Sequence, residues 1–215
     1  MVLPTRDAVG QVSGLSYIVR DLSAGMALQE ALRQQAFHDP LTDLPNRRLL
    51  HDRLGRAQQN SRRLGSLAAV LAIGLDPIEP LQRRLGSVAG EQWLLTVARR
   101  LVEAVRETDT IARLDGAEFM VVCENLGADP ALANLRAAAL EAKITSALTQ
   151  PLPGSEMGCG QISIGHRLFS GSDDDIDRLI ADADLAMIRH RAQQAPRPVA
   201  ADDGDDQDDD FDDGE

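Results

Sequence analysis

An α+β domain, with one mainly antiparallel sheet covered by helices, is the fold class that this 215-residue sequence predicts. Stretches with strand patterns alternate with stretches of helical periodicity along the chain. One Asp-Gly pair, Asp115-Gly116, lies between two apolar runs, which is among the strongest short-range signals for a hairpin. An apolar fraction of 43% can supply the hydrophobic core that such a sheet needs.

The first half of the chain predicts two strands and two helices. Residues 7–21 alternate apolar and polar side chains after a Gly-containing turn and predict a strand there, and residues 24–37 predict a connecting helix. After the turn "HDPLTDLP", a basic helix is expected from Asn46, a candidate N-cap, to about Arg63. The continuous apolar run at 66–75 is typical of a buried central strand.

The second half of the chain is expected to supply the remaining strands and the helices that cover the sheet. Residues 87–106 form a strongly periodic helix with Trp93 and Val97 on its apolar side, and the hairpin follows at 110–124. A helix is then expected at about 129–149, a strand at 160–169 and an amphipathic helix at about 174–192. This order of elements builds a single antiparallel sheet.

The charge of the chain is concentrated at its end. The net charge is −12, but ten acidic residues lie in 202–215, which leaves −2 for the remainder. We expect residues 194–215 to form a disordered acidic tail, which either only solvates the chain or competes for a basic site on the domain. The basic residues between 47 and 63 form a modest cluster with few aromatics, so no nucleic-acid binding is expected.

The cysteines and the apolar runs indicate the cellular compartment in which we expect the protein. Cys123 and Cys159 lie far apart without CxxC spacing, which favours a reduced, cytoplasmic protein without a structural zinc. No apolar run approaches the roughly 18 residues that span a bilayer, so no direct membrane insertion is expected. His51, His166 and His190 are isolated, and we expect them to hold no metal.

Several short motifs in one order resemble the GGDEF family, the diguanylate cyclases that condense two GTP molecules into cyclic di-GMP. They are "HDPLTDLPNRRLL" (38–50), "RLDGAEF" (113–119), "ISIG" (162–165) and "ADLAM" (183–187). The resemblance implies that residues 38–193 form a palm-like sheet with helices over it. Residues 1–23 resemble the last strand and linker of a PAS sensor domain, and 24–37 would connect them to the GGDEF domain.

The resemblance also implies that the cyclase machinery is degenerate. The family holds two metal ions with carboxylates, because hard cations prefer oxygen ligands. The corresponding positions of its active site are here Gly74, Asp76, Glu79, Gln82, Glu91, Asp115, Gly116, Ala117, Glu118 and Arg191. Gly74 and Ala117 replace the two main metal ligands, and Glu79 replaces a lysine that holds phosphate. We therefore expect no magnesium site, no cofactor and no cyclase activity, with "DGAEF" kept as a structural hairpin.

A second motif, "RETD" (106–109), precedes the hairpin turn at the offset where relatives bind cyclic di-GMP as a regulatory ligand. A guanidinium can donate two parallel hydrogen bonds to O6 and N7 of a guanine, and a carboxylate can accept from its N1 and N2 hydrogens. The resemblance assigns these roles to Arg106 and Asp109, with Lys143 in place of a further arginine. The alternative is an ordinary ion pair between Arg106 and Asp109 at a helix end.

Three hypotheses for the function follow. The leading one is a catalytically inactive GGDEF domain that acts as a cyclic di-GMP receptor in bacterial signalling, with a protein partner or a homodimer formed through residues 24–37. A nucleotide-independent protein-interaction scaffold is the second. The third is a regulatory domain that binds GTP without turnover through Gln82, Glu91 and Arg191, which Glu79 opposes because it repels a triphosphate.

Overall fold

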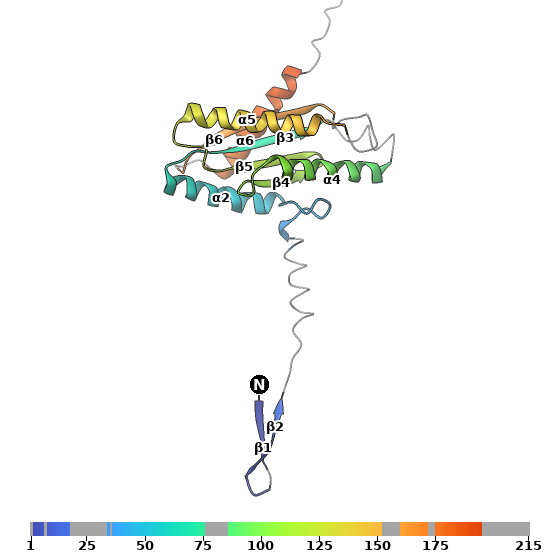
Figure 1. Ribbon diagram of the computed structural model, residues 1–215, viewed down its shortest axis with the longest axis vertical. Coiled ribbons are helices and arrows are strands. Elements are labelled where there is room, and N and C mark those ends of the chain that lie inside the picture. Colours follow the sequence, from blue (N-terminus) through green and yellow to red (C-terminus); the bar gives the residue numbers. More distant parts are fainter. Residues whose placement is uncertain are drawn as a thin grey trace, which may run out of the picture.

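A computed structural model describes residues 2–6, 8–17, 34, 36–75, 86–151, 160–171 and 175–194. Its main body is a four-stranded sheet in the order β4-β5-β3-β6, in which all neighbours are antiparallel. The elements of this body are α2 (Arg47–Leu64), β3 (Ala68–Leu75), α4 (Ser87–Ala104), β4 (Thr110–Asp115), β5 (Glu118–Cys123), α5 (Pro130–Thr149), β6 (Ile162–Phe169) and α6 (Ile176–Gln194). Helices cover both faces of the sheet (Figure 1). The predicted fold class is confirmed.

The central strand β3 separates two hydrophobic cores. Leu71 and Ile73 belong to the core that contains the buried side chains of α4 and α5, whereas Val70 and Ala72 belong to the core with those of α2 and α6. Every residue of β3 is buried, as the continuous apolar run predicted. The sheet is therefore a middle layer between two pairs of helices.

The ends of α2 follow its capping residues. Asn46 Oδ1 accepts hydrogen bonds from the backbone N–H of Arg48 (3.0 Å) and Leu49 (3.2 Å), which confirms Asn46 as the N-cap. At the other end Gly65 has a φ of 60°, a left-handed conformation that suits glycine and stops the helix. The helices expected at 87–106, 129–149 and 174–192 are confirmed within a few residues as α4, α5 and α6.

The hairpin is shifted by one residue from its predicted turn. Asp115 pairs with Glu118, so the connecting residues are Gly116 and Ala117, whereas the sequence predicted Asp115-Gly116. An irregularity between Arg113 and Asp115 moves the register by one residue. Gly116 takes the positive φ of 50° that the turn requires.

The outer edge of β6 is covered by the end of α6. The backbone N–H of Ile164 donates to His190 Nδ1 (3.0 Å), and Gln194 Nε2 donates to the carbonyl of Ile162 (3.2 Å). At the opposite edge of the sheet, the backbone N–H of Arg113 donates to the carbonyl of Pro45 (2.9 Å). Both edge strands thus have backbone groups bonded outside the sheet.

The N-terminal residues form a separate hairpin of β1 (Val2–Arg6) and β2 (Val12–Tyr17). The strand predicted within 7–21 after a Gly-containing turn is found as β2, and Gly10 with a φ of 84° lies in that turn, but β1 before it was not predicted. Of the helix expected at 24–37, only residues 34, 36 and 37 are described, and they are helical. The acidic tail beyond residue 194 lies outside the described residues, and its predicted disorder stays a prediction.

No helix in the described part of the chain is long and apolar enough to cross a membrane. Cys123 is a buried free thiol on β5, and burial raises its pKa to about 12. Cys159 lies outside the described residues. A thiol with so high a pKa is inert at neutral pH, which excludes Cys123 as a nucleophile.

Candidate functional site

The predicted site residues lie at opposite ends of the sheet. Gly74, near the end of β3, is opposite Glu118, whereas Ala69, near its start, is opposite Cys123. We call the first the turn end, because the hairpin turn of residues 116–117 lies there, and the second the RETD end. Five residue steps of about 3.3 Å separate Ala69 from Gly74, so the two ends are about 17 Å apart.

At the turn end, one row of residues crosses three strands. Gly74 pairs with Glu118 of β5 on one side and with Ser163 of β6 on the other. All three lie on the α6 face of the sheet, because side chains alternate and Ala72 and Met120 belong to the core on that face. Ser163 is 1% exposed, whereas Glu118 is exposed.

Arg191 and Met187 of α6 fill the space in front of Gly74. A Cβ built on Gly74 would clash with Arg191 Nη2 and would lie 2.7 Å from Met187 Sδ. Within the described residues, Arg191 Nε and Ser163 Oγ are both buried without a hydrogen-bond partner. A guanidinium therefore occupies the place where the resemblance expects a carboxylate side chain.

Charged side chains from α2, β5 and α6 act on one another at the turn end. Burial raises the pKa of Asp184 and the nearby charge of Glu118 raises it further, while Arg47 partly opposes both. No group of three or more His, Cys, Asp or Glu side chains among the described residues is placed to hold a metal ion. With Arg191 in front of Gly74, the described residues here do not fit a magnesium ion.

The other active-site positions divide into two groups. Asp76, Glu79 and Gln82 lie outside the described residues, so their predicted roles stay untested. Glu91 is exposed on α4, and Ala117 contributes its carbonyl to a hydrogen bond from the backbone N–H of Leu75 (3.3 Å). That bond ties the hairpin turn to the end of β3 without any carboxylate.

At the RETD end, Arg106 and Asp109 are joined through the backbone. Asp109 Oδ2 accepts from the N–H of Arg106 (3.0 Å), and the N–H of Asp109 donates to the carbonyl of Arg106 (2.9 Å). Among the described residues the two side chains form no ion pair, and Arg106 is exposed. The two residues are joined by backbone hydrogen bonds in place of a direct salt bridge, and the charge of Arg106 still acts on the Asp109 carboxyl.

The carboxyl group of Asp109 is half-buried and responds to its surroundings. Burial raises its pKa, and the charge of Glu124 adds to this effect, while the N–H and the charge of Arg106 oppose it. The Asp109 carboxyl is held by the N–H of Arg106, and the Arg106 residue itself is exposed. This pair presents a fixed acceptor and an accessible planar donor at one turn.

Lys143 lies at the same level of the molecule as Arg106. Helices α4 and α5 run antiparallel (Figure 1), and Arg100 of α4 donates to the carbonyls of Gln150 and Pro151 at the end of α5 (2.6 Å each). Arg106 lies two residues beyond the last residue of α4, Ala104, and Lys143 precedes Gln150 by about 10 Å of helix. Lys143 is exposed, and its role as a ligand residue stays a prediction.

The loop before α2 is held by Asp39. Asp39 Oδ1 accepts from the N–H of Thr42 (2.8 Å), from Thr42 Oγ1 (2.6 Å) and from Arg113 Nη1 (2.9 Å). Burial alone would raise the pKa of Asp39, but the hydrogen bonds from Thr42 and Arg113 outweigh it and lower the pKa. His38 belongs to the same loop, and its Nδ1 lies 2.8 Å from the carbonyl oxygen of Asp43.

Comparison with known proteins settles the family. The model described as "Diguanylate cyclase, GGDEF domain" matches residues 36–197. The chain belongs to the GGDEF family. Diguanylate cyclase TpbB of Pseudomonas aeruginosa is 36% identical over 176 residues, which cover 79% of this chain and 39% of that protein.

Solved structures agree with this assignment. A sensory box/GGDEF family protein from Caulobacter crescentus matches with a TM-score of 0.66 and 35% identity, over 73% of this chain and 98% of that one. The coiled coil and GGDEF domain of DgcB from the same species, in complex with c-di-GMP, shares the fold with a TM-score of 0.66 and 18% identity, over 80% and 90% of the two chains. This GGDEF chain spans 23% to 39% of the length of the curated relatives it matches first.

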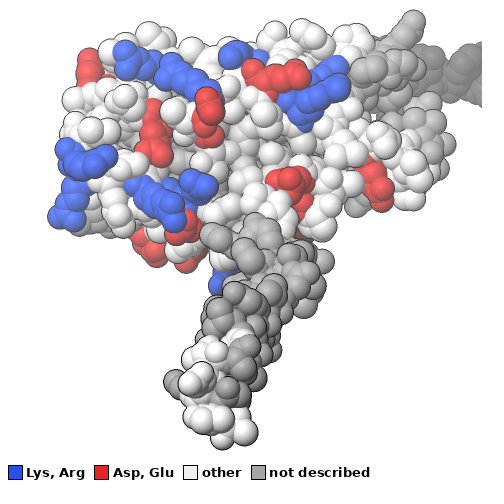
Figure 2. All heavy atoms as spheres, turned by 60° about the horizontal axis from the view of Figure 1, so that its bottom comes forward, with Lys and Arg blue, Asp and Glu red and all other residues white. Residues whose placement is uncertain are grey.

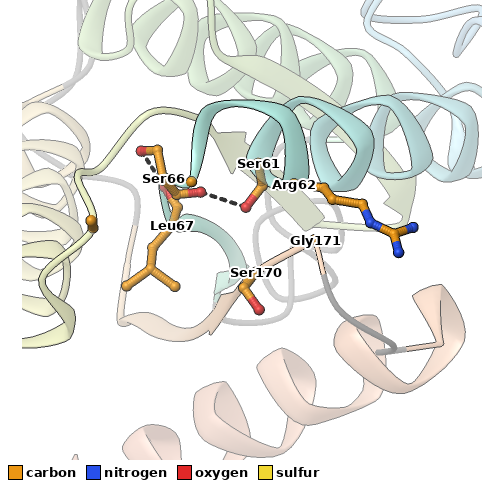
Figure 3. Close-up of a pocket in the computed structure, with 8 residues that line it drawn as sticks. Ser61, Arg62, Ser66, Leu67, Ser170 and Gly171 are labelled. Carbon is orange, nitrogen blue, oxygen red and sulfur yellow. Dashed lines mark hydrogen bonds between the residues drawn. The ribbon is translucent and has the colours of Figure 1, made fainter.

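Two hollows on the GGDEF domain lie outside both candidate sites. One, of about 340 Å³, lies where α2 ends and β3 begins (Figure 3). Its hydroxyl groups serve the fold, since Ser61 Oγ donates to the carbonyl of Ser66 and Ser66 Oγ accepts from the N–H of Gly127 (3.0 Å). Figure 3 shows the Arg62 side chain pointing away from it. We assign no ligand to this hollow.

The second hollow, of about 660 Å³, lies between residues 34–38 and one side of α2. Arg48 stacks 4.8 Å from the centre of the Phe37 ring, and Arg56 pairs with Asp52 (3.1 Å). Figure 2 shows that Lys and Arg side chains are interspersed with Asp and Glu on the face it views. Most of the basic side chains here therefore have local partners, as expected for a solvated helix.

Two residues of the turn end were missed by the sequence reasoning. Asp184 lies within the "ADLAM" motif, and Ser163 lies within "ISIG". Each is a polar residue in an otherwise apolar motif, which is a signal that was available. Neither could be placed beside Arg191 before the packing of α6 on β6 was known.

Proposed function

We propose that this GGDEF domain binds cyclic di-GMP at the RETD end and does not synthesise it. The observation that carries the proposal is the state of Arg106, whose guanidinium is exposed and makes no ion pair among the described residues, beside a carboxyl that is held in place. Such a pair can contact guanine edges without first breaking an internal salt bridge. The domain would then act as a receptor in bacterial signalling, in a reduced, cytoplasmic setting.

The chemistry of the ligand supports this site. An arginine can donate bidentately to O6 and N7 of guanine, and an ionised Asp109 can accept from N1 and N2 hydrogens. Lys143, at the same level of the helix pair, would add a positive charge near the phosphates. Several structures that share the fold, including that of DgcB, contain c-di-GMP.

Titration calorimetry with cyclic di-GMP tests the receptor. The wild-type chain is expected to bind in the low-micromolar range, and Arg106→Ala is expected to lose about 1–3 kcal/mol, roughly 5- to 150-fold in affinity. Arg53→Ala, an exposed arginine on α2, serves as the matched control and should bind like wild type. Wild-type protein that fails to bind cyclic di-GMP would refute the receptor and favour the scaffold hypothesis.

The lack of cyclase activity is a separate prediction. Gly74 and Ala117 support it, because neither can ligate a metal and because Arg191 stands in front of Gly74. Incubation of the purified chain with GTP and Mg²⁺, followed by chromatography, is expected to yield no cyclic di-GMP. Accumulation of the product above the level of a Gly165→Val control, which we expect to be unfolded, would contradict this half of the proposal.

The segments before the GGDEF domain are the proposed route for the signal. A bound ligand would act on a protein partner or on a second copy of the chain through residues 24–37, or, if 1–23 are PAS-like, through that segment. GTP binding without turnover is a second candidate, which the calorimetry tests with GTP as the titrant. Binding of GTP alone, unaffected by Arg106→Ala, would favour that candidate over the receptor.

A further inference from the structure

We propose that Arg191 acts as a built-in cation at the turn end, in the space that a metal-binding side chain at position 74 would need. The inference rests on the proposed loss of the cyclase's metal site and adds a cause for it. Under this proposal, Gly74 is not only a missing ligand. It is the residue whose lack of a side chain admits the guanidinium.

The close approach of Arg191 to β3 depends on glycine. Any Cβ at position 74 would clash with Arg191 Nη2, and Met187 Cε would lie only 3.3 Å from it. Glycine within a strand weakens the strand, and it often marks a place where another group approaches the backbone closely. Here the approaching group is the charged end of an α6 side chain.

The inner part of the Arg191 side chain is buried. Nε is buried without a hydrogen-bond partner among the described residues, and Ser163 Oγ is another buried, unpartnered polar atom on the same face of the sheet. A buried polar group without a partner is costly. Both atoms would gain from an acceptor placed between β3 and α6.

Charged side chains of both signs lie at the turn end. Glu118 and Asp184 supply carboxylates at the turn end, and Arg47 opposes the rise in the pKa of Asp184. Arg191 would add a second fixed positive charge there. An aspartate restored at position 74 would need the space that Arg191 occupies, and a divalent cation at that point would meet a like charge.

Manganese binding distinguishes these possibilities. The Gly74→Asp/Ala117→Asp variant, which restores both acids, is compared with the same variant carrying Arg191→Gln, and free Mn²⁺ is followed by electron paramagnetic resonance. We expect the protein with Arg191 to bind Mn²⁺ at least about tenfold more weakly than the protein without it. Equal affinities, or no binding by either protein, would overturn the proposal. Arg189→Gln in the same background, an exposed arginine on α6, should leave Mn²⁺ binding unchanged.

A stability cycle checks the same contact without any metal. Urea unfolding of wild type, Gly74→Asp, Arg191→Gln and the double variant should show that Gly74→Asp lowers the folding equilibrium constant about tenfold more when Arg191 is present, because the new side chain needs the space of the guanidinium. An equal loss in both backgrounds would show that the two side chains do not compete for one space. Cyclic di-GMP titration of the folded variants separates this proposal from the receptor, because the RETD end lies at the other end of the sheet and its affinity should not change.

Discussion

Gly165→Val is expected to leave the GGDEF domain largely unfolded, with a loss of about 3 kcal/mol or more in the free energy of unfolding. A Cβ at position 165 would clash with the backbone N of Met187 and the carbonyl carbon of Ala186, and would lie 2.7 Å from the Cβ of Ala186. These are mostly backbone atoms of α6, which no change of rotamer can move. The helix would have to lift from β6, and the core between them would open.

Gly55→Ala is the matched control for this prediction. A Cβ there would lie 3.5 Å from Ile176 Cδ1, an ordinary contact, and residue 55 lies inside α2. Since alanine is a better helix former than glycine by up to about 1 kcal/mol, this variant should be neutral or more stable. Chemical denaturation followed by circular dichroism measures both. Equal stability of the two variants would contradict the close packing of α6 on β6.

Replacement of Arg113 by methionine should cost about 2–4 kcal/mol, because it leaves the partly buried carboxylate of Asp39 without its charged partner. The Arg113 side chain is 11% exposed and that of Asp39 18%. Arg113 also donates to the carbonyl of Gly116 from Nε (3.1 Å) and Nη2 (2.8 Å), so it joins the loop before α2 to the hairpin turn. Urea denaturation at neutral pH measures the loss.

Arg56→Met provides the comparison for Arg113. Arg56 pairs with Asp52 four residues earlier on α2, but its side chain is 64% exposed. Exposed pairs of this kind contribute about 0.3–0.5 kcal/mol. A loss as small for Arg113→Met as for Arg56→Met would show that the Asp39 network adds little stability.

The Arg113 effect should also depend on pH. Folding lowers the pKa of Asp39 below its usual value of 3.8, so the folded protein binds fewer protons there than the unfolded chain does. The stabilisation is therefore fully present above pH 3.8 and is lost as the pH falls through the folded pKa. The difference in stability between wild type and Arg113→Met should shrink in that acidic range, and a difference that stays constant would exclude Asp39 as its source.

Local patterns were sufficient to predict most of the fold. The N-cap of α2 and the burial of β3 follow from interactions between residues close in the sequence or from a continuous apolar run. The turn at Gly116 and Ala117 was misplaced, because a bulge in β4 depends on pairing with β5. The RETD pair was found by its motif, but its backbone link and the exposed guanidinium required the structure.

The contact between Gly74 and Arg191 shows where sequence reasoning ends. Both positions were recognised, and each was judged by the residue that it replaces in the family. Their mutual dependence is set by how α6 packs across β3, which no local pattern encodes. Glycine in a strand was a sign of close approach, but the sequence did not say what approaches.

The bonded edges of the sheet limit how this domain can join other chains. The N–H of Ile164 and the carbonyl of Ile162 are engaged by His190 and Gln194, and the N–H of Arg113 is engaged by Pro45. A foreign strand that sought to extend the sheet would have to displace these bonds at either edge. Fibre-like stacking through β6 or β4 is thereby disfavoured.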